Sequence, residues 1–315
     1  LILCMEIMVD ADWERSIPFY NISLTTTESI FRQFDERIYV FGIDRVPTGC
    51  RNSNYAVSTS RGRFFMQICP ESVARTLSRE SLAAIGKNGV SMPEMLYCSG
   101  QNPTGRLVMI YEFIEGVPLE AVDMNDDVIE QVAGAAAGIH HADIRNDGTY
   151  ISLDDYPAFF GWYDMFLSRE PAVSRLDPET VARIKALIGD NLHNLQRIEQ
   201  YESFIHCDFR PANMILGSDG GVFITDWEFA GFGHTLADIG QFFRYGERFS
   251  SRHAELFFRA YNRRAARPLP DEWYALAKLR DLVNPLQMLG SRMHMTNRER
   301  DLIRVVNHTL EYFGY

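Results

Sequence analysis

The stretch 204–229 constrains the fold of this chain most, because polar residues flank two short β-type runs within it. The runs are 214–216 and 222–224, and Gly220 and Gly221 lie between them, as a hairpin turn requires. Pairing the runs brings the residues that precede the first run close to those that follow the second. At this open end of the hairpin we expect three side chains to meet, those of Asp208, Asn213 and Asp226.

Two carboxylates and an amide in one small space provide oxygen atoms for a metal ion and for proton transfer. Mg²⁺ prefers oxygen ligands and usually takes one or two carboxylates together with substrate phosphates. In kinase-type phosphoryl transfer, one Asp accepts the proton of the substrate hydroxyl, while an Asn and a second Asp hold the metal. Protein kinases carry these groups as His-Arg-Asp, a later Asn and Asp-Phe-Gly. Asn213 follows Asp208 at the same interval, so the pattern indicates phosphoryl transfer with Mg²⁺.

His206, Asp208 and Asn213, followed by Asp-Trp-Glu at 226–228, resemble the motif of the aminoglycoside phosphotransferase and choline kinase-like family. An ordinary hairpin with turn carboxylates is the alternative, but it does not require the Asn together with the downstream Asp-Trp-Glu. The family consists of small-molecule kinases with a protein-kinase-like fold.

The resemblance implies an α+β chain with a bilobal, protein-kinase-like fold. A small antiparallel-sheet lobe over 1–114 would bind the nucleotide, and a larger, mainly helical lobe over 115–315 would hold the catalytic and substrate-binding groups. Within the first lobe, the spacing of apolar residues such as Ile30 and Phe34 predicts a helical lead-in over 12–45.

The resemblance also implies roles within the motif. Asp208 would orient and deprotonate the acceptor hydroxyl. Arg210 lies where protein kinases carry a Lys near the transferred phosphate, and an Arg there would steady that phosphate. Asn213 and Asp226 would hold Mg²⁺. The phosphoryl donor would be ATP or GTP.

The nucleotide contacts that the resemblance implies lie in the first lobe. A turn that contains Asn52 would cover the phosphates, and backbone groups around Glu112 and Ile114 would bind adenine. Gln67 departs from the family, because it stands where kinase-like folds carry a Lys or Arg for the α- and β-phosphates. Glu80 falls where the Glu partner of that cation lies, so the usual ion pair becomes at best a hydrogen bond to Gln67.

Three explanations of Gln67 remain open. The strand alignment can be shifted, so that Arg63 or another basic residue binds the phosphates. Alternatively, Arg210 compensates for the missing charge. In the third case the chain binds nucleotide poorly and has become a ligand-binding pseudokinase. The choice matters, because charge-assisted hydrogen bonds are about twice as strong as neutral ones.

Charge and composition narrow the partners and the compartment. The chain carries 31 Lys and Arg against 42 Asp and Glu, and the net charge of −11 disfavours a nucleic-acid partner and suits a cationic small molecule. No run approaches the roughly 20 apolar residues of a membrane span, and the opening residues lack the basic start of a signal peptide. The cysteines are scattered without a Cys-x-x-Cys pair, which indicates reduced thiols in the cytoplasm.

The acceptor is expected to be a small hydroxyl compound. Protein kinases need a long activation segment after the second Asp, and none follows Asp226. Aminoglycoside antibiotics are the leading candidates, because their amines suit an acidic site. A metabolic alcohol of the choline, homoserine or sugar type is the alternative enzyme substrate. The oligomeric state is expected to be a monomer or a dimer.

Overall fold

The N-terminal lobe is built on a five-stranded antiparallel sheet with the strand order β1-β2-β3-β5-β4. The computed structural model describes residues 13–47, 49–70, 77–145, 150 and 152–315. Strands β2 and β3 form a hairpin that turns at Gly62, whose φ of +105° suits a residue without a Cβ. The strands are β1 (Val40–Val46), β2 (Ser53–Thr59), β3 (Gly62–Ile68), β4 (Met95–Ser99) and β5 (Val108–Glu112).

One amphipathic helix, α1 (Leu24–Phe34), packs on this sheet. The helix begins after Ser23, whose side chain accepts a hydrogen bond from the Thr26 amide and so caps the first turn. Its buried residues Ile30 and Phe31 belong to the same hydrophobic core as the inner residues of β2, β3 and β5. The ring of Phe31 also meets that of Phe64 edge to face, with 5.6 Å between the centroids.

The predicted helical lead-in over 12–45 is correct only for α1. Residues 13–23 contain no helix, and 40–46 form strand β1, which pairs with β2 in antiparallel fashion. The β-branched residues of this segment favour extended backbone, and their partner strand lies nearby in the sequence. The strand therefore replaces the expected continuation of the helix.

A second, three-stranded sheet begins where the chain leaves the first lobe. It contains β6 (Gly116–Pro118), β8 (Met214–Gly217) and β9 (Val222–Ile224) in the order β6-β8-β9. The predicted hairpin is confirmed as β8 and β9. In its turn Gly220 adopts a φ of +84°, and the Gly217 amide donates to the Gly221 carbonyl at 2.8 Å.

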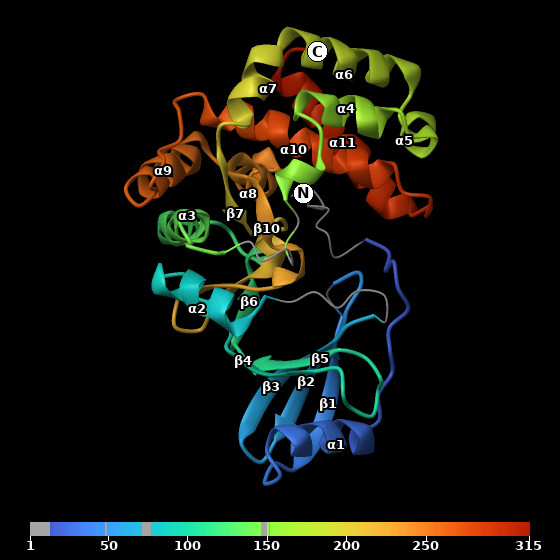
Figure 1. The fold of residues 1–315 in the computed structure, drawn as a ribbon, viewed down its shortest axis with the longest axis vertical. Coiled ribbons are helices and arrows are strands. Elements are labelled where there is room, and N and C mark those ends of the chain that lie inside the picture. Colours follow the sequence, from blue (N-terminus) through green and yellow to red (C-terminus); the bar gives the residue numbers. More distant parts are fainter. Residues whose placement is uncertain (1–12, 48, 71–76, 146–149, 151) are drawn as a thin grey trace, which may run out of the picture.

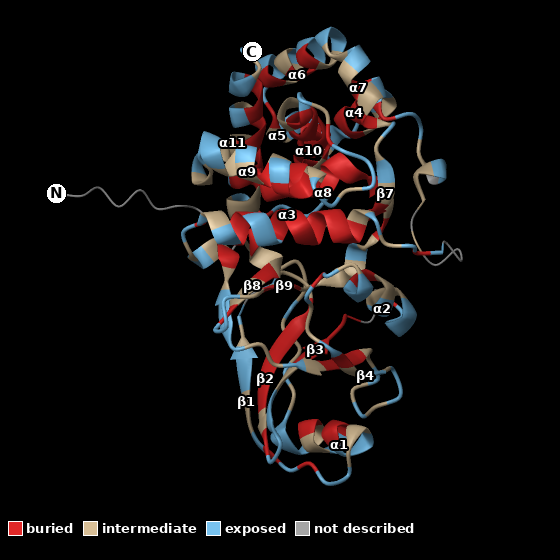
Figure 2. Ribbon diagram, turned by 90° about the vertical axis from the view of Figure 1, so that its left-hand side faces the viewer, coloured by how far each residue is buried: buried red, intermediate tan, exposed pale blue. Residues whose placement is uncertain are grey.

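The C-terminal lobe is mainly helical, and Figure 1 shows it stacked on the sheet lobe along the long axis of the molecule. Its most buried helices are α3, α8 and α10, which appear mostly red in Figure 2. Strands β7 (Glu202–Ile205) and β10 (Gly231–His234) pair beside them. The helices outside α1 are α2 (Arg79–Lys87), α3 (Asp126–His140), α4 (Phe160–Leu167), α5 (Glu170–Arg175), α6 (Pro178–Asp190), α7 (Leu192–Ile198), α8 (Thr235–Phe242), α9 (Ser251–Asn262), α10 (Trp273–Leu289) and α11 (Thr296–Tyr312).

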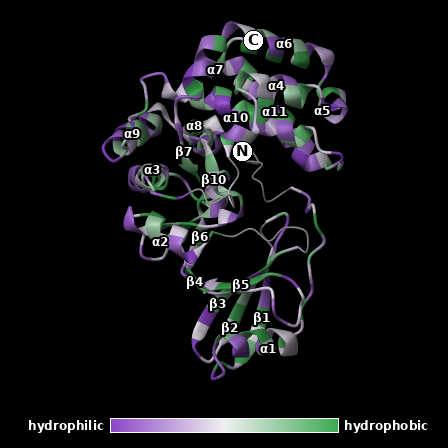
Figure 3. Cartoon of the chain, viewed as in Figure 1, coloured by the Kyte–Doolittle hydropathy of each residue, from purple (hydrophilic) through white to green (hydrophobic). Residues whose placement is uncertain are grey.

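The predicted α+β class with a small antiparallel-sheet lobe and a larger helical lobe is confirmed. Figure 3 shows hydrophilic and hydrophobic residues mixed around the outer helices α6 and α11, as expected for helices with one solvent-facing side. Within the described residues, no helix combines the length and the apolar character that crossing a bilayer demands.

Candidate active site

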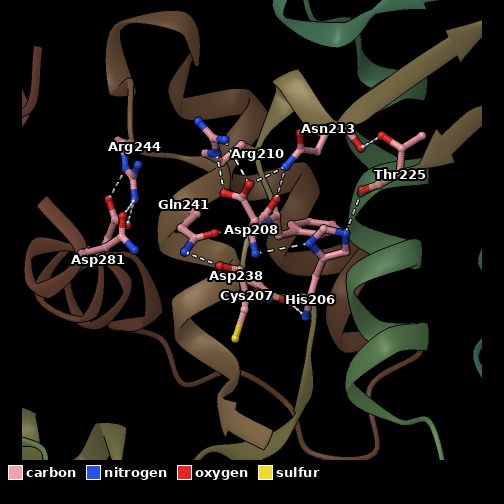
Figure 4. Close-up of polar contacts among 12 residues, drawn as sticks. His206, Cys207, Asp208, Arg210, Asn213, Thr225, Asp238, Gln241, Arg244 and Asp281 are labelled. Carbon is pink, nitrogen blue, oxygen red and sulfur yellow. Dashed lines mark hydrogen bonds and ion pairs between the residues drawn. The ribbon is translucent and has the colours of Figure 1, made fainter. Parts of the chain in front are cut away.

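The loop between β7 and β8 carries the first half of the motif, and α8 holds it in place (Figure 4). Asp238 of α8 is fully buried, and its carboxylate accepts the backbone amides of His206 at 2.7 Å and Cys207 at 2.9 Å. His140 of α3 lies 3.2 Å from the same carboxylate through Nε2. The side chain of Gln241 donates to the Cys207 carbonyl at 3.0 Å. Helices α3 and α8 therefore fix the backbone of this loop.

The backbone and the histidine of this loop have defined conformations. Cys207 has a φ of +66°, a left-handed conformation that costs a residue with a Cβ on the order of 1 kcal/mol. The buried ring of His206 accepts the Asp208 amide at Nδ1 (3.3 Å) and donates from Nε2 to the Thr225 carbonyl (2.9 Å). Burial lowers the pKa of His206, which keeps the ring neutral. The histidine thus braces the loop against the end of β9.

Asp208 lies at the centre of the site, and two side chains hold its carboxylate. Arg210 donates from Nε to Oδ1 at 2.5 Å and from Nη2 to Oδ2 at 3.0 Å. Asn213 donates from Nδ2 to Oδ2 at 2.7 Å. Burial raises the pKa of Asp208 to about 7, and the charge of Asp226 adds to the rise. The sequence-predicted residues Asp208, Arg210 and Asn213 are therefore in direct contact.

Asp226 follows β9 and faces the same space. Its φ of 65° and ψ of 61° place it in the left-handed region, before a short 3-10 helix, Trp227–Phe229. The Thr225 amide donates to the Asn213 carbonyl at 2.9 Å and closes the end of the hairpin. Burial raises the pKa of Asp226, and the charge of Glu228 adds to this, whereas the charge of Arg210 and the side chain of Gln67 oppose the rise. The hairpin thus gathers the motif residues as the sequence predicts.

Two sequence-predicted residues of the first lobe reach this cluster. Asn52, in the turn between β1 and β2, donates from Nδ2 to Glu228 Oε2 at 3.1 Å. Gln67 of β3 is buried, and its side chain lies near enough to Asp226 to lower the pKa of that carboxyl group. The hydrogen bond expected between Gln67 and Glu80 is absent: Glu80 lies exposed in the first turn of α2. Gln67 and Glu80 therefore do not pair as the resemblance implies.

The two predicted adenine-binding positions differ in whether the backbone amide already donates a hydrogen bond. Glu112 ends β5, and its amide donates to the Glu94 carbonyl at 3.0 Å. Ile114 lies between β5 and β6, and its amide has no partner among the described residues. Of these two positions, Ile114 is therefore the one with a backbone donor for a ligand.

The donor set at the open end of the hairpin fits a cation. Asp226 Oδ1 is buried and has no hydrogen-bond partner among the described residues. The charges of Asp226 and Glu228 both raise the pKa of Asp208, so an added positive charge would stabilise the ionised carboxylates. Within the described part of the chain, no group of three His, Cys, Asp or Glu side chains could hold a metal alone. A Mg²⁺ ion here would need the amide of Asn213 and ligand phosphates to complete its shell.

A short N-terminal segment, 13–16, joins the two lobes beside Asp208, and we call it the strap. On the helical lobe, the Trp13 Nε1 donates to Asp301 Oδ2 at 3.1 Å, and the Arg210 guanidinium lies 5.7 Å from the Trp13 ring centroid. Glu14 accepts the amides at the start of α11, those of Asn297 at 2.8 Å and Arg298 at 3.2 Å. One end of the strap is thus fixed to α11.

The other end of the strap holds the turn between β1 and β2. Arg15 donates to the Arg51 carbonyl at 3.2 Å and the Asn52 carbonyl at 2.7 Å, and it also bonds to the Gly49 carbonyl. Ser16 donates its amide to the Cys50 carbonyl at 3.0 Å. The strap therefore holds the backbone of the turn from which the Asn52 side chain reaches Glu228.

The helical lobe adds a buried ion pair next to the loop (Figure 4). Arg244 binds Asp281 through two hydrogen bonds, at 2.7 and 2.9 Å, and Asn284 at 2.8 Å. Burial raises the pKa of Asp208, and the positive charge of Arg244 opposes this rise. Asp301 accepts Tyr245 Oη at 2.6 Å, so a second carboxylate lies on this side.

Sequence reasoning gave no role to Glu228, Arg244 or Asp301. Glu228 lies inside the Asp-Trp-Glu segment, so the motif itself carried the signal. Arg244 and Asp301 lie in stretches that the sequence identifies only as helical, and no local pattern distinguishes them from solvent-facing charges.

One comparison with known proteins identifies the family, and another identifies solved structures with the same fold. The sequence pattern of the phosphotransferase enzyme family matches residues 42–276. No curated protein matches the sequence. An aminoglycoside phosphotransferase from Alicyclobacillus acidocaldarius has a similar structure, with a TM-score of 0.63 at 14% identity over 94% of this chain and 95% of that one.

Two further solved structures share the fold at low identity. A choline kinase from Streptococcus pneumoniae gives a TM-score of 0.60 at 15% identity, over 91% of this chain and 99% of that one. A spectinomycin phosphotransferase in complex with ADP and spectinomycin gives 0.59 at 12% identity, over 94% of this chain and 96% of that one.

Proposed function

Because the chain belongs to the phosphotransferase enzyme family and is a small-molecule kinase, we propose that it transfers the γ-phosphoryl group of ATP or GTP to a hydroxyl of an amine-bearing acceptor. The single observation that carries this proposal is the meeting of Asp208, Asn213 and Asp226 at the open end of one hairpin. Such an arrangement serves proton removal and metal-assisted phosphoryl transfer together.

Asp208 acts as the general base in this proposal. One of its carboxylate oxygens takes the proton of the acceptor hydroxyl as the oxygen attacks the γ-phosphorus. A pKa of about 7 suits this task, because a base works best when its pKa lies near the working pH. Arg210 orients the carboxylate through its two hydrogen bonds and would steady the transferred phosphate.

Asn213 and Asp226 would hold Mg²⁺, which when bound supplies positive charge to the phosphate oxygens. In the first lobe, the Asn52 turn would cover the phosphates and the Ile114 backbone would bind the adenine. Glu80 has no contact that supports a nucleotide role. The four described cysteines, Cys50, Cys69, Cys98 and Cys207, are unbridged, which supports a cytoplasmic location.

An amine-bearing acceptor is supported by charge and by the similar structures. The net charge of −11 attracts cations. Aminoglycosides and choline, the compounds named for two of the similar proteins, combine a hydroxyl with a cationic nitrogen. We propose an aminoglycoside-type antibiotic as acceptor, with a metabolic alcohol of the choline type as the second candidate, because both kinds of protein match at nearly equal TM-scores, 0.63 and 0.60.

The test is the release of ADP or GDP with Mg·ATP or Mg·GTP against a panel of aminoglycosides, choline, homoserine and sugars. We expect an acceptor-dependent rate with at least one amine-bearing compound. Asp208→Ala should lower kcat by about a thousandfold, the order expected for a general base, and should leave nucleotide binding within about twofold. Asp219→Ala, in the exposed turn of the same hairpin, is the matched control and should retain full activity.

Two outcomes would overturn the proposal. Asp208→Ala that keeps most of its kcat would remove the base from the mechanism. A chain that binds Mg·ATP but phosphorylates nothing, and whose Asp226→Asn variant binds the nucleotide equally well, would be a pseudokinase. Gln67 favours the pseudokinase alternative, because it carries no charge where phosphates are expected to bind.

A further inference from the structure

The position of Gln67 raises a question of charge in the nucleotide site. Gln67 is only 7% exposed and its side-chain amide is uncharged, so it brings no positive charge to a polyphosphate. Arg63, the candidate left open by the sequence, is engaged elsewhere. It forms an ion pair with Glu115 at 2.9 Å, and its guanidinium lies 4.0 Å from the Phe113 ring centroid. A shift of the strand alignment therefore does not supply the missing cation.

Arg210 does not supply the missing positive charge either, because its guanidinium is bound to Asp208, the proposed base. Its guanidinium binds both carboxylate oxygens of Asp208 and lies against the Trp13 ring on the helical lobe. To bind the α- and β-phosphates it would have to leave Asp208. A group that steadies the base and the transferred phosphate is not positioned to anchor the rest of the nucleotide.

Arg51 is a cation in the turn between β1 and β2 that points to the same cluster. Its Nε is buried and has no hydrogen-bond partner among the described residues. Its guanidinium carbon lies 5.7 Å from the Phe229 ring centroid, on the segment that follows Asp226.

The turn that carries Arg51 is fixed from both sides. Arg15 of the strap holds the carbonyls of Arg51 and Asn52, and the Asn52 side chain binds Glu228 of the helical lobe. The side chain of Arg51 is therefore presented from an anchored backbone. A guanidinium with a buried, unpaired donor, beside the segment that follows Asp226, is arranged to bind an anion that arrives together with a metal ion.

We infer that Arg51 binds the nucleotide's α- and β-phosphates and supplies the positive charge that Gln67 lacks. The phosphate-binding cation of this chain then lies on the β1–β2 turn and not on strand β3. This inference rests on the proposed function, since it assumes that the site takes a nucleoside di- or triphosphate. It explains how the chain keeps a kinase motif without a basic residue at position 67.

Calorimetric titration of the full chain with Mg·ADP and, separately, with adenosine tests the inference. Arg51→Gln should weaken Mg·ADP binding by about tenfold or more, because a charge-assisted contact is lost. Binding of adenosine, which has no phosphate, should change by less than about twofold. Arg51→Lys, which keeps the charge, should lose clearly less affinity for Mg·ADP than Arg51→Gln.

Arg61→Gln is the matched control, because Arg61 pairs with Asp35 at the far end of the same sheet and should leave both affinities unchanged. The inference is overturned if Arg51→Gln binds Mg·ADP like the unmodified chain, or if it loses adenosine to the same extent, which would mean a collapsed turn. It also falls if Arg51→Lys is as weak as Arg51→Gln. If the unmodified chain binds neither ligand, the proposed function itself fails, and that result is distinct from the others.

Discussion

Replacing Asp238 by Asn tests whether α8 holds the catalytic loop in its working conformation. The carboxylate has no exposed surface, accepts the amides of His206 and Cys207, and contacts His140. Asn has the same shape but a single oxygen. One of the two backbone amides must therefore face an NH₂ group, and a buried donor is left without an acceptor.

The size of the effect follows from these contacts. A hydrogen bond to a charged group contributes about 1.5–3 kcal/mol, and a buried donor left unpaired costs a similar amount. The surviving bond becomes neutral and loses about half of its strength. Removing the buried charge lowers the desolvation cost and offsets part of this loss. We expect the free energy of unfolding to fall by about 3 kcal/mol.

The kinetic effect should be large as well. Cys207 keeps its φ of +66° because the backbone on either side of it is held by α8. When the amide of Cys207 loses its acceptor, the residue can relax and displace the neighbouring Asp208. A misplacement of about 1 Å costs about a hundredfold in rate, so kcat should fall by about that factor.

Urea unfolding and steady-state kinetics with the best acceptor measure both effects. Asp219→Asn is the matched control, because Asp219 also accepts a backbone amide, that of Gly221 at 3.0 Å, but lies exposed in the hairpin turn. Its unfolding free energy should change by less than about 0.5 kcal/mol. If Asp238→Asn were no less stable than Asp219→Asn and kept its kcat, the bracing role of α8 would be refuted.

Three further predictions concern pH and packing. The value of kcat/KM should rise with pH up to a limb near 7, because the base must be ionised and the pKa of Asp208 is raised to about 7; a limb near 4 would contradict this. The folded protein then holds a proton that the unfolded chain releases, so the unfolding free energy should fall between pH about 4 and about 7, and Asp208→Asn should flatten that slope in urea titrations. Gly240→Ala should lower the unfolding free energy by about 1–3 kcal/mol, because its Cβ would press on the Ala277 carbonyl and lie 2.8 Å from the Asp281 Cβ. Gly42→Ala, with no atom within 4 Å of the new Cβ, is the control, and equal effects of the two changes would exclude the close helix contact as the cause.

The part of the site that the sequence predicts is the part that local structure holds together. Two β-type runs and a pair of glycines suffice to form a hairpin, and the hairpin alone brings Asn213 to Asp226. The two-lobed architecture follows from the resemblance that this motif carries. Roles for individual site residues and the boundary between residues 114 and 115 stay predictions.

The parts that the sequence does not predict depend on long-range contacts. Glu80 matches a family position by its order along the chain. In the fold, however, Glu80 is exposed whereas Gln67 is buried, and the two do not pair. Arg51 looks like any basic turn residue until the turn is placed against Phe229. Trp13 and Asp301 are 288 positions apart, and no local pattern relates them.

The strap adds a set of non-covalent contacts between the two lobes. The covalent link between β5 and β6 joins the lobes. The contacts of residues 13–16 join them again, from the β1–β2 turn to the start of α11. Separation of the lobes therefore requires the strap to release either the β1–β2 turn or α11, and it also breaks the hydrogen bond from Asn52 to Glu228.

The match to the family covers 42–276 and contains neither the strap nor α11, to which the strap is fixed. The matched segment therefore contains every predicted motif residue, whereas the strap and α11 lie outside it. A variant that began after residue 16 would keep every motif residue and lose the contacts that the strap makes with both lobes.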